Sequence, residues 1–319
     1  MKITVIGCGR WGSFIAYYLD KIGHDVTIYG LADAPEMKRF LTERRNDLLT
    51  LSDTTKLSTD KSVIKDAETI VISIGCQGLR SLMKELDELK LENKNFVLCM
   101  KGVEIETGCR LSEIVKSAVS VTNRIAVWLG PGHVQEFYRG VPNCMVIDSD
   151  DDELKLKLVN EFSSELIRFY YGTDLIGSEI GGAAKNVLGI AAGMLDGLSM
   201  TTLKGALMSR GTREIARLMK AMGGNELSAY GLCLLGDYEA TLFSKHSHNR
   251  AFGEAFVKGE TFGALAEGYY TAKAMMTLKN KYKVDLPICT AVYETLYEGA
   301  DPKAELTGLF NRSLKWELE

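Results

Sequence analysis

A short apolar run, a glycine-rich turn and a helical pattern open this chain, and their order constrains its fold more than any other feature. Residues 3–6 are expected to form a strand, and Gly7, Gly9 and Gly12 follow in the spacing GxGxxG. There the glycines would allow a tight turn, a close approach to a pyrophosphate and close helix–strand packing. A glycine-rich turn without a ligand is the alternative. We favour dinucleotide binding, because a second expected strand, 26–29, follows the helix.

The helix expected at 13–22 would present free N–H groups and partial positive charge to phosphates. The second strand ends at Tyr29 with neither the acid that holds the ribose of NAD nor an arginine for the 2′-phosphate of NADP. Asp33 lies slightly too far along, and Lys38 and Arg39 lie on the expected next helix. The expected cofactor is therefore NAD or NADP.

The pattern of the sequence changes near residue 176. Before it, β-branched runs alternate with helical patterns, as is typical of a parallel sheet with crossover helices. The expected strands are 3–6, 26–29, 69–74, 96–100, 125–129, 144–147 and 167–171, and the helices include 13–22, 81–89, 111–119 and 151–164. Later helices are expected around 180–195, 201–222, 249–258, 262–281 and 290–298. We predict an α/β protein with an N-terminal Rossmann-type parallel-sheet domain, 1–176, and an all-helical C-terminal domain, 177–319, packed around a ligand cleft.

Composition narrows the classes of partner and location. A content of 46% hydrophobic and 25% charged residues is ordinary for a globular protein, and a net charge of −4 gives no basic face for nucleic acid. The seven scattered cysteines form no CxxC pair, which favours reduced thiols in the cytoplasm. The apolar stretch 180–195, in which Lys185 is the only charge, is short for a membrane span and reads as a buried helix. We expect no signal peptide.

Eight motifs along nearly the whole chain resemble those of one known family. They are GCGRWG at 7–12, KGVEIETG at 101–108, LGPG at 129–132, GGAAKNVLGIAAGMLDGL at 181–198, SRGTREIARLMKAMGG at 209–224, LLGDYEAT at 234–241, HNRAFGE at 248–254 and AEGYYTAK at 266–273. The chain thereby resembles the bacterial NAD(P)-dependent glycerol-3-phosphate dehydrogenases. The resemblance implies interconversion of dihydroxyacetone phosphate, a small phosphorylated substrate, and sn-glycerol 3-phosphate for phospholipid synthesis. A homodimer is compatible with it.

The resemblance also implies roles for particular residues. Lys185 would be the catalytic general acid and base, and Lys101 and Asp237 complete the catalytic set. The implied cofactor contacts are Gly7, Gly9, Arg10, Trp11, Gly12, Lys101, Val134, His248 and Glu267. The implied substrate contacts are Lys101, Gly130, Lys185, Asn186, Asp237, Thr241, Ser247, His248 and Asn249. No metal is expected, because His246 and His248 have no third ligand nearby.

The residue types support these roles, although each residue could instead have a purely structural role. Lys185 interrupts an apolar helix, where desolvation would lower the pKa of its amine toward the range useful for proton transfer. The alternative is a lysine that snorkels to the surface. Asp237 is suited to N-cap a helix near Tyr238, with Thr241 four residues on along the same face. Lys101 follows a strand at the carboxyl edge of the sheet, where ligands bind, but would equally serve as an exposed loop residue.

Two departures from the family pattern concern the substrate. The chain has HNR at 248–250 where the family usually has RNR, and an imidazole is not equivalent to a bidentate guanidinium as a phosphate ligand. It has GPG at 130–132 where the family usually has a final Ser or Thr. A paralogue that reduces another small phosphorylated ketone or aldehyde is therefore an alternative, as is a non-catalytic dinucleotide sensor. Lys185, Lys101 and Asp237 argue against the sensor.

Overall fold

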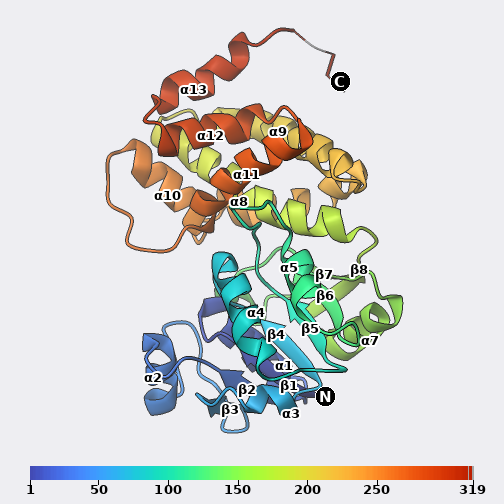
Figure 1. Ribbon diagram of the computed structural model, residues 1–319. Coiled ribbons are helices and arrows are strands. Elements are labelled where there is room, and N and C mark those ends of the chain that lie inside the picture. Colours follow the sequence, from blue (N-terminus) through green and yellow to red (C-terminus); the bar gives the residue numbers. More distant parts are fainter. Residues whose placement is uncertain (315, 318–319) are drawn as a thin grey trace. The chain divides into compact units, whose positions relative to one another are not determined.

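The computed structural model describes residues 1–314 and 316–317 (Figure 1). The chain divides into two compact units. Unit 1 comprises Met1–Met100 and Leu111–Leu175, and unit 2 comprises Lys101–Arg110 and Ile176–Glu319. Each unit has its own apolar core.

The two continuous domains expected from the sequence differ from these units at residue 176 and in one longer segment. Lys101–Arg110 follows a strand of unit 1 but belongs to unit 2. Val103 is fully buried in the core of unit 2, and Arg110 forms an ion pair with Glu179 at 2.6 Å. Burial of an apolar side chain and pairing of a largely buried cation therefore hold this segment in the second unit.

An eight-stranded sheet forms the framework of unit 1. The strands are β1 (Lys2–Ile6), β2 (Asp25–Tyr29), β3 (Lys56–Ser58), β4 (Thr69–Ile72), β5 (Asn95–Leu98), β6 (Arg124–Leu129), β7 (Asn143–Asp148) and β8 (Ile167–Tyr171). Their order is β3-β2-β1-β4-β5-β6-β7-β8. The seven expected strands are confirmed, while β3 was not expected because three residues at a sheet edge carry no apolar run.

The sheet is parallel as predicted except for one pair, β6 and β7, which run antiparallel. The connection between them contains only the short helix α6 (Val134–Tyr138). A helix of this length spans about 7.5 Å. A six-residue strand extends about 20 Å. The register Val127↔Asp148 and Leu129↔Val146 shows that β7 runs opposite to β6, so the connection does not return the chain to the starting end of β6.

Helices connect the strands of unit 1 and cover the sheet. They are α1 (Arg10–Lys21), α2 (Pro35–Glu43), α3 (Val63–Asp66), α4 (Leu79–Asp87), α5 (Leu111–Ala118), α6 and α7 (Asp152–Phe162). The side chain of Asp151 caps α7 by accepting a hydrogen bond from Leu154 N. The aromatic ring of Tyr18 in α1 is buried at 6.0 Å from the ring of Trp128 in β6, which fixes α1 on the sheet.

Unit 2 is helical, as predicted. Its α-helices are α8 (Leu175–Gly197), α9 (Lys204–Ala221), α10 (His248–Val257), α11 (Glu267–Tyr282), α12 (Pro287–Tyr297) and α13 (Pro302–Gly308). Every residue of α8 from Ile180 to Leu195 is buried, which confirms the expected buried helix. Within residues 1–314 and 316–317, no helix is long and apolar enough to cross a membrane.

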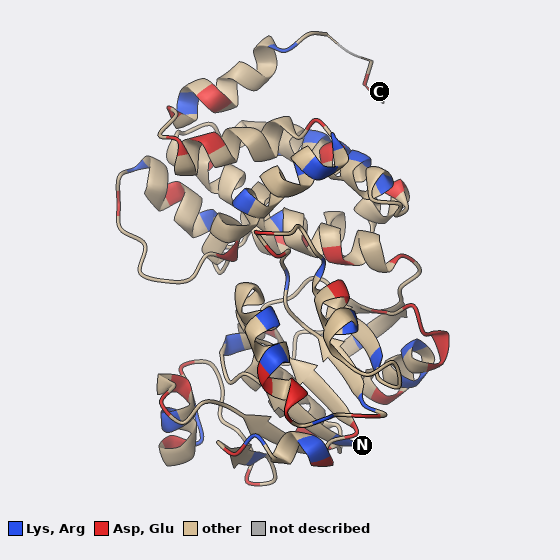
Figure 2. Ribbon diagram, viewed as in Figure 1, with Lys and Arg blue, Asp and Glu red and all other residues tan. Residues whose placement is uncertain are grey.

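Neither the surface charges nor the cysteine thiols indicate a functional site in either unit. Figure 2 shows Lys and Arg interspersed with Asp and Glu on helices of both units. All seven cysteines are free thiols. The functional residues are therefore to be sought among buried or half-buried side chains, where charge is costly and must be paired.

Candidate active site

The glycine turn of unit 1 lies where the strand order of the sheet reverses. β1 pairs with β2 on one side and with β4 on the other, and all three run parallel. Gly7 follows β1 at φ +107° and donates its N–H to the carbonyl of Tyr29. Ligands of such sheets bind at this carboxyl edge.

The three glycines differ in what surrounds them. A Cβ on Gly12 would lie 2.2 Å from the carbonyl oxygen of Gly7, so the helix packs directly on the turn. A Cβ on Gly9 would meet no heavy atom within 4 Å, and no side chain caps the start of α1. This bare backbone at an uncapped helix N-terminus fits the pyrophosphate of a dinucleotide.

The other cofactor residues expected in unit 1 have different environments. Arg10 and Trp11 begin α1, and the ring of Trp11 lies 6.2 Å from that of Phe137. Val134 begins α6 and is buried in the core, so its side chain supports the fold. Contacts of Arg10, Trp11 and Val134 with the cofactor stay predictions.

The missing hydroxyl at position 132 has a packing explanation. Gly130 and Gly132 both have positive φ angles, +127° and +141°. A Cβ on Gly132 would lie 2.2 Å from the ring of Phe137. A serine or threonine at this position would require the aromatic ring to move, so the departure from the family pattern accompanies the packing of Phe137.

In unit 2 a single buried carboxylate is shared by two lysines. Asp237 accepts a hydrogen bond from Lys101 Nζ at 2.7 Å and pairs with Lys185 Nζ at 2.8 Å. Lys185 Nζ also donates to Thr241 Oγ1 at 2.7 Å, and that hydroxyl lies 3.5 Å from Asp237 Oδ1. Four residues from three segments distant in sequence, all expected in one site, are therefore joined through Asp237 and Lys185.

Burial explains the chemistry of this cluster. Asp237 is 1% exposed and Lys185 is 7% exposed. Burial lowers the pKa of Lys185 to about 8, the charge of Asp237 acts to raise this pKa, and Lys101 acts to lower it. The predicted desolvation of Lys185 is confirmed, and the alternative of a snorkelling lysine is wrong. Lys101 is likewise no exposed loop residue, because its ammonium is bound to Asp237.

The alternative reading of Asp237 as a helix N-cap is also wrong. Asp237 ends a 3₁₀ turn, η4 (Leu235–Asp237), and a π-helical turn, η5 (Glu239–Phe243), follows. The residue before η5 is Tyr238, and it makes no side-chain cap. The carboxylate of Asp237 is used by the two lysines instead. Single π turns occur frequently at functional sites, where they re-aim side chains.

Two asparagine amides next to this cluster are held by the backbone. Asn186 Nδ2 donates to the carbonyl of Lys101 at 3.4 Å. Asn249 Nδ2 donates to Asn186 Oδ1 at 3.0 Å, and Asn249 Oδ1 accepts the N–H of Gly268 at 2.8 Å. This chain of hydrogen bonds joins α8, α10 and the first turn of α11.

The remaining expected residues of unit 2 lie around α10 and α11. Ser247 Oγ accepts the N–H of Arg250 and so caps α10. His248 Nδ1 lies 3.1 Å from the carbonyl oxygen of Leu265 and therefore donates its proton to it. Glu267 is the first residue of α11. Direct contacts of Ser247, His248 and Glu267 with ligands stay predictions.

Glycines on α8 let these elements approach its backbone. A Cβ on Gly189, one turn after Lys185, would lie 2.8 Å from Thr241 Cγ2 and 3.2 Å from Asn249 Cβ. A Cβ on Gly193 would lie 1.9 Å from the carbonyl oxygen of Arg250. Thr241 reaches Lys185 because the face of α8 beside it has no side chains.

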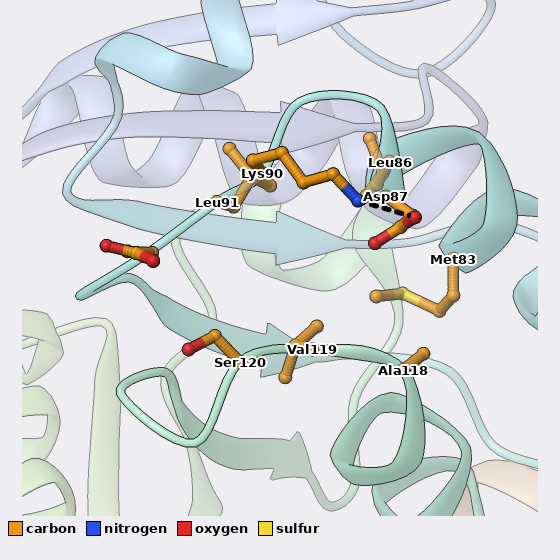
Figure 3. Close-up of a pocket in the computed structure, with 9 residues that line it drawn as sticks. Met83, Leu86, Asp87, Lys90, Leu91, Ala118, Val119 and Ser120 are labelled. Carbon is orange, nitrogen blue, oxygen red and sulfur yellow. Dashed lines mark hydrogen bonds and ion pairs between the residues drawn. The ribbon is translucent and has the colours of Figure 1, made fainter.

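Two cavities within the single units do not coincide with the expected site residues. One, of about 100 Å³, lies in unit 1 between the ends of α4 and α5, where Lys90 pairs with Asp87 (Figure 3). The other, of about 470 Å³, lies in unit 2 and is lined by Leu207, Ile288 and Phe310 among others. No candidate residue lines either cavity. Among residues 1–314 and 316–317, no three His, Cys, Asp or Glu side chains are grouped so that they could hold a metal ion.

Sequence reasoning missed a second charged cluster beside the first. Lys204 Nζ binds Asp196 Oδ2 at 2.5 Å, and Arg250 Nη1 binds the same oxygen at 2.9 Å. Arg250 also pairs with Glu254, one helical turn on, which is the only signal of this cluster in the sequence. Since its guanidinium is bound by two carboxylates, Arg250 is poorly suited to hold a phosphate.

Comparisons with known proteins agree with these features. Models of NAD-dependent glycerol-3-phosphate dehydrogenase match residues 2–155 for its N-terminus and 174–307 for its C-terminus. The chain is 34% identical to a glycerol-3-phosphate dehydrogenase (NAD(P)+) of Fusobacterium nucleatum, over 100% of this chain and 99% of that protein. It is 35% identical to one of Clostridium botulinum, over 99% of each. The solved glycerol-3-phosphate dehydrogenase of Coxiella burnetii has a TM-score of 0.91 and 26% identity, over 97% of this chain and 98% of that chain.

The shared carboxylate predicts how the Lys185 amine titrates. Asp237→Asn removes the negative charge that favours the ammonium and leaves the repulsion from Lys101, so the pKa of Lys185 should fall below about 8. Competitive labelling of amines across a pH series, read by mass spectrometry, measures this pKa directly. Asp285→Asn, which removes the partner of Arg312 at the surface of unit 2, is the control and should leave the pKa unchanged. A rise in the pKa of Lys185 in Asp237→Asn would contradict the account.

Proposed function

Because this chain belongs to the NAD-dependent glycerol-3-phosphate dehydrogenase family, we propose that it interconverts dihydroxyacetone phosphate and sn-glycerol 3-phosphate with NAD or NADP. The observation that carries the proposal is the buried Lys185 amine bound to Asp237 and Thr241. Reduction of a ketone to an alcohol needs a hydride on carbon and a proton on oxygen. When bound, the nicotinamide cofactor supplies the hydride.

Lys185 supplies the proton in this proposal. Its ammonium donates to the carbonyl oxygen as the alcohol forms, and the neutral amine left behind regains a proton from water. In oxidation the neutral amine takes the proton of the hydroxyl. A pKa of about 8 keeps both forms populated near neutral pH, which is the condition for acid catalysis in one direction and base catalysis in the other.

Asp237, Thr241 and Lys101 set the position and the protonation of the Lys185 amine. Asp237 and Thr241 bind Nζ and fix its position, while the second cation on the same carboxylate limits how far Asp237 stabilises the ammonium. We place Lys101 and Asn186 near the polar groups of the substrate, since both are tied to this cluster. The geometry therefore favours an enzyme over a sensor, which has no use for a buried amine poised for proton transfer.

The phosphate of the substrate is assigned to Asn249 and His248 at the start of α10. The amide of Asn249 is oriented by Asn186 and Gly268, and α10 begins at His248 with its first N–H groups. Arg250 is excluded as the main phosphate ligand because Asp196 and Glu254 already bind it. The free thiols fit a reducing compartment, so we propose a cytoplasmic enzyme that supplies glycerol phosphate for phospholipid synthesis.

Removal of the Lys185 amine tests the proposed chemistry. Lys185→Ala should lower kcat for dihydroxyacetone phosphate by at least roughly a hundredfold, the usual scale for losing a general acid. Cofactor affinity, measured by calorimetry, should change little because the glycine turn of unit 1 is untouched. The control is Lys273→Ala, which removes a lysine that contacts only the face of Tyr297 in its described interactions. Near-normal turnover in Lys185→Ala would remove this residue from the mechanism.

Position 248 tests the identity of the substrate. An imidazole loses its charge as pH rises through neutrality, so KM for dihydroxyacetone phosphate should rise between about pH 6 and 8. His248→Arg should lower KM and flatten this rise, because a guanidinium stays charged and binds phosphate bidentately. Steady-state kinetics over a pH series provide the measurement. Loss of activity in His248→Arg, or no turnover of dihydroxyacetone phosphate by the natural chain, would favour a paralogue with another phosphorylated ketone or aldehyde as substrate.

A further inference from the structure

The second charged cluster of unit 2 joins three helices through one carboxylate. Asp196 lies near the end of α8, Lys204 begins α9 and Arg250 lies in the first turn of α10. Lys204 and Arg250 both bind Asp196 Oδ2, at 2.5 and 2.9 Å. Thr201 Oγ1 donates to the other oxygen of Asp196 at 3.0 Å. The carboxylate is therefore bound at both oxygens.

The two cations of this cluster also bind the end of the π-helical turn that carries Thr241. Lys204 Nζ donates to the carbonyl of Leu242 at 3.0 Å, and Lys204 is only 5% exposed. Arg250 Nε donates to the carbonyl of Ser244 at 3.3 Å. The last carbonyls of a helical turn have no partner within the turn, and cations satisfy them well.

From these contacts we infer that Asp196, Lys204 and Arg250 form a positioning cluster that sets the place of Thr241 against the Lys185 amine. Thr241 directly precedes Leu242, whose carbonyl Lys204 holds. Asn249 directly precedes Arg250, so the same cluster fixes the start of α10. None of its three members contacts Lys185 in the described interactions, and they act on the reaction only through Thr241 and Asn249.

The glycine face of α8 supports this inference independently. Thr241 and Asn249 both lie against Gly189, and the carbonyl of Arg250 lies against Gly193. These contacts leave no space for a Cβ on α8. The π-helical turn and α10 therefore pack directly on the backbone of α8, and polar interactions must hold them there. The cluster provides these interactions, because Lys204 and Arg250 bind the π-helical turn and α10 to Asp196 near the end of α8.

The expected change in turnover rests on the proposed function. The expected displacement of Thr241 can be measured without a substrate, through the pKa of Lys185. The charged neighbours of Lys185 are Asp237 and Lys101. Thr241 accepts a hydrogen bond from Lys185 Nζ. If Thr241 moves away, the ammonium loses an acceptor, so the pKa of Lys185 should fall. A role limited to stability would not change this pKa in the folded protein.

The test uses Lys204→Met in the full chain, with Lys155→Met as a matched control. Lys155 is also largely buried, pairs with Asp152 and donates to the carbonyl of Ser149, but it lies in unit 1. Competitive labelling should show a lower pKa of Lys185 in Lys204→Met and no change in Lys155→Met. Turnover of dihydroxyacetone phosphate should fall roughly tenfold or more in Lys204→Met, since small misplacements of a catalytic group are costly. Lys204→Arg should restore most of both properties.

Each outcome of this test decides the inference. A folded Lys204→Met with an unchanged pKa of Lys185 and turnover within about twofold of the natural chain would overturn it. If Lys204→Met does not fold, Arg250→Lys takes its place, because the shorter cation keeps the charge but loses the fork that joins Asp196 and Ser244. If the natural chain does not turn over dihydroxyacetone phosphate, the proposed function fails, while the labelling of Lys185 still decides the positioning role.

Discussion

The pairing of one buried carboxylate, Asp237, with two lysine ammonium groups is the interaction on which the candidate active site of unit 2 depends. A charge removed from water is costly, and this cost is offset only by close partners with good geometry. Two cations on one anion leave an excess positive charge around a carboxylate that is 1% exposed. Burial is the main cause that lowers the pKa of Lys185, and the charge of Lys101 lowers it further. The excess positive charge also makes the site attractive to an anionic substrate.

The fold holds this charge arrangement by bringing together segments that are far apart in the sequence. Lys101 comes from a short segment that leaves the first unit after β5 and joins the second. Lys185 lies in the centre of the buried helix α8, and Asp237 and Thr241 lie on a 3₁₀ turn followed by a π turn. Irregular helical turns place two side chains on one amine, where a regular helix from Asp237 onward would direct the carboxylate toward its own backbone.

The sequence predicted the elements that have strong local patterns. The β-branched runs became strands, the apolar stretch around Lys185 became a buried helix, and the GxGxxG turn has an open backbone at Gly9. Local patterns do not predict β3, whose three edge residues lack an apolar run, or the antiparallel direction of β7, which depends on how the connection from β6 folds. They also do not reveal that Lys204 and Arg250 share Asp196, because such a cluster depends on how three helices pack. The loss of a hydroxyl at Gly132 is understood only beside the ring of Phe137.

The central claim is that one amine, Lys185, carries the proton in both directions of the reaction. The pH dependence of kcat in the natural chain, measured for ketone reduction and for alcohol oxidation, tests it most directly. Reduction needs the ammonium and should slow as pH rises through about 8, whereas oxidation needs the neutral amine and should accelerate over the same interval. Both limbs should report one apparent pKa. Profiles that are flat through this interval, or that change in the same direction for both reactions, would contradict the account.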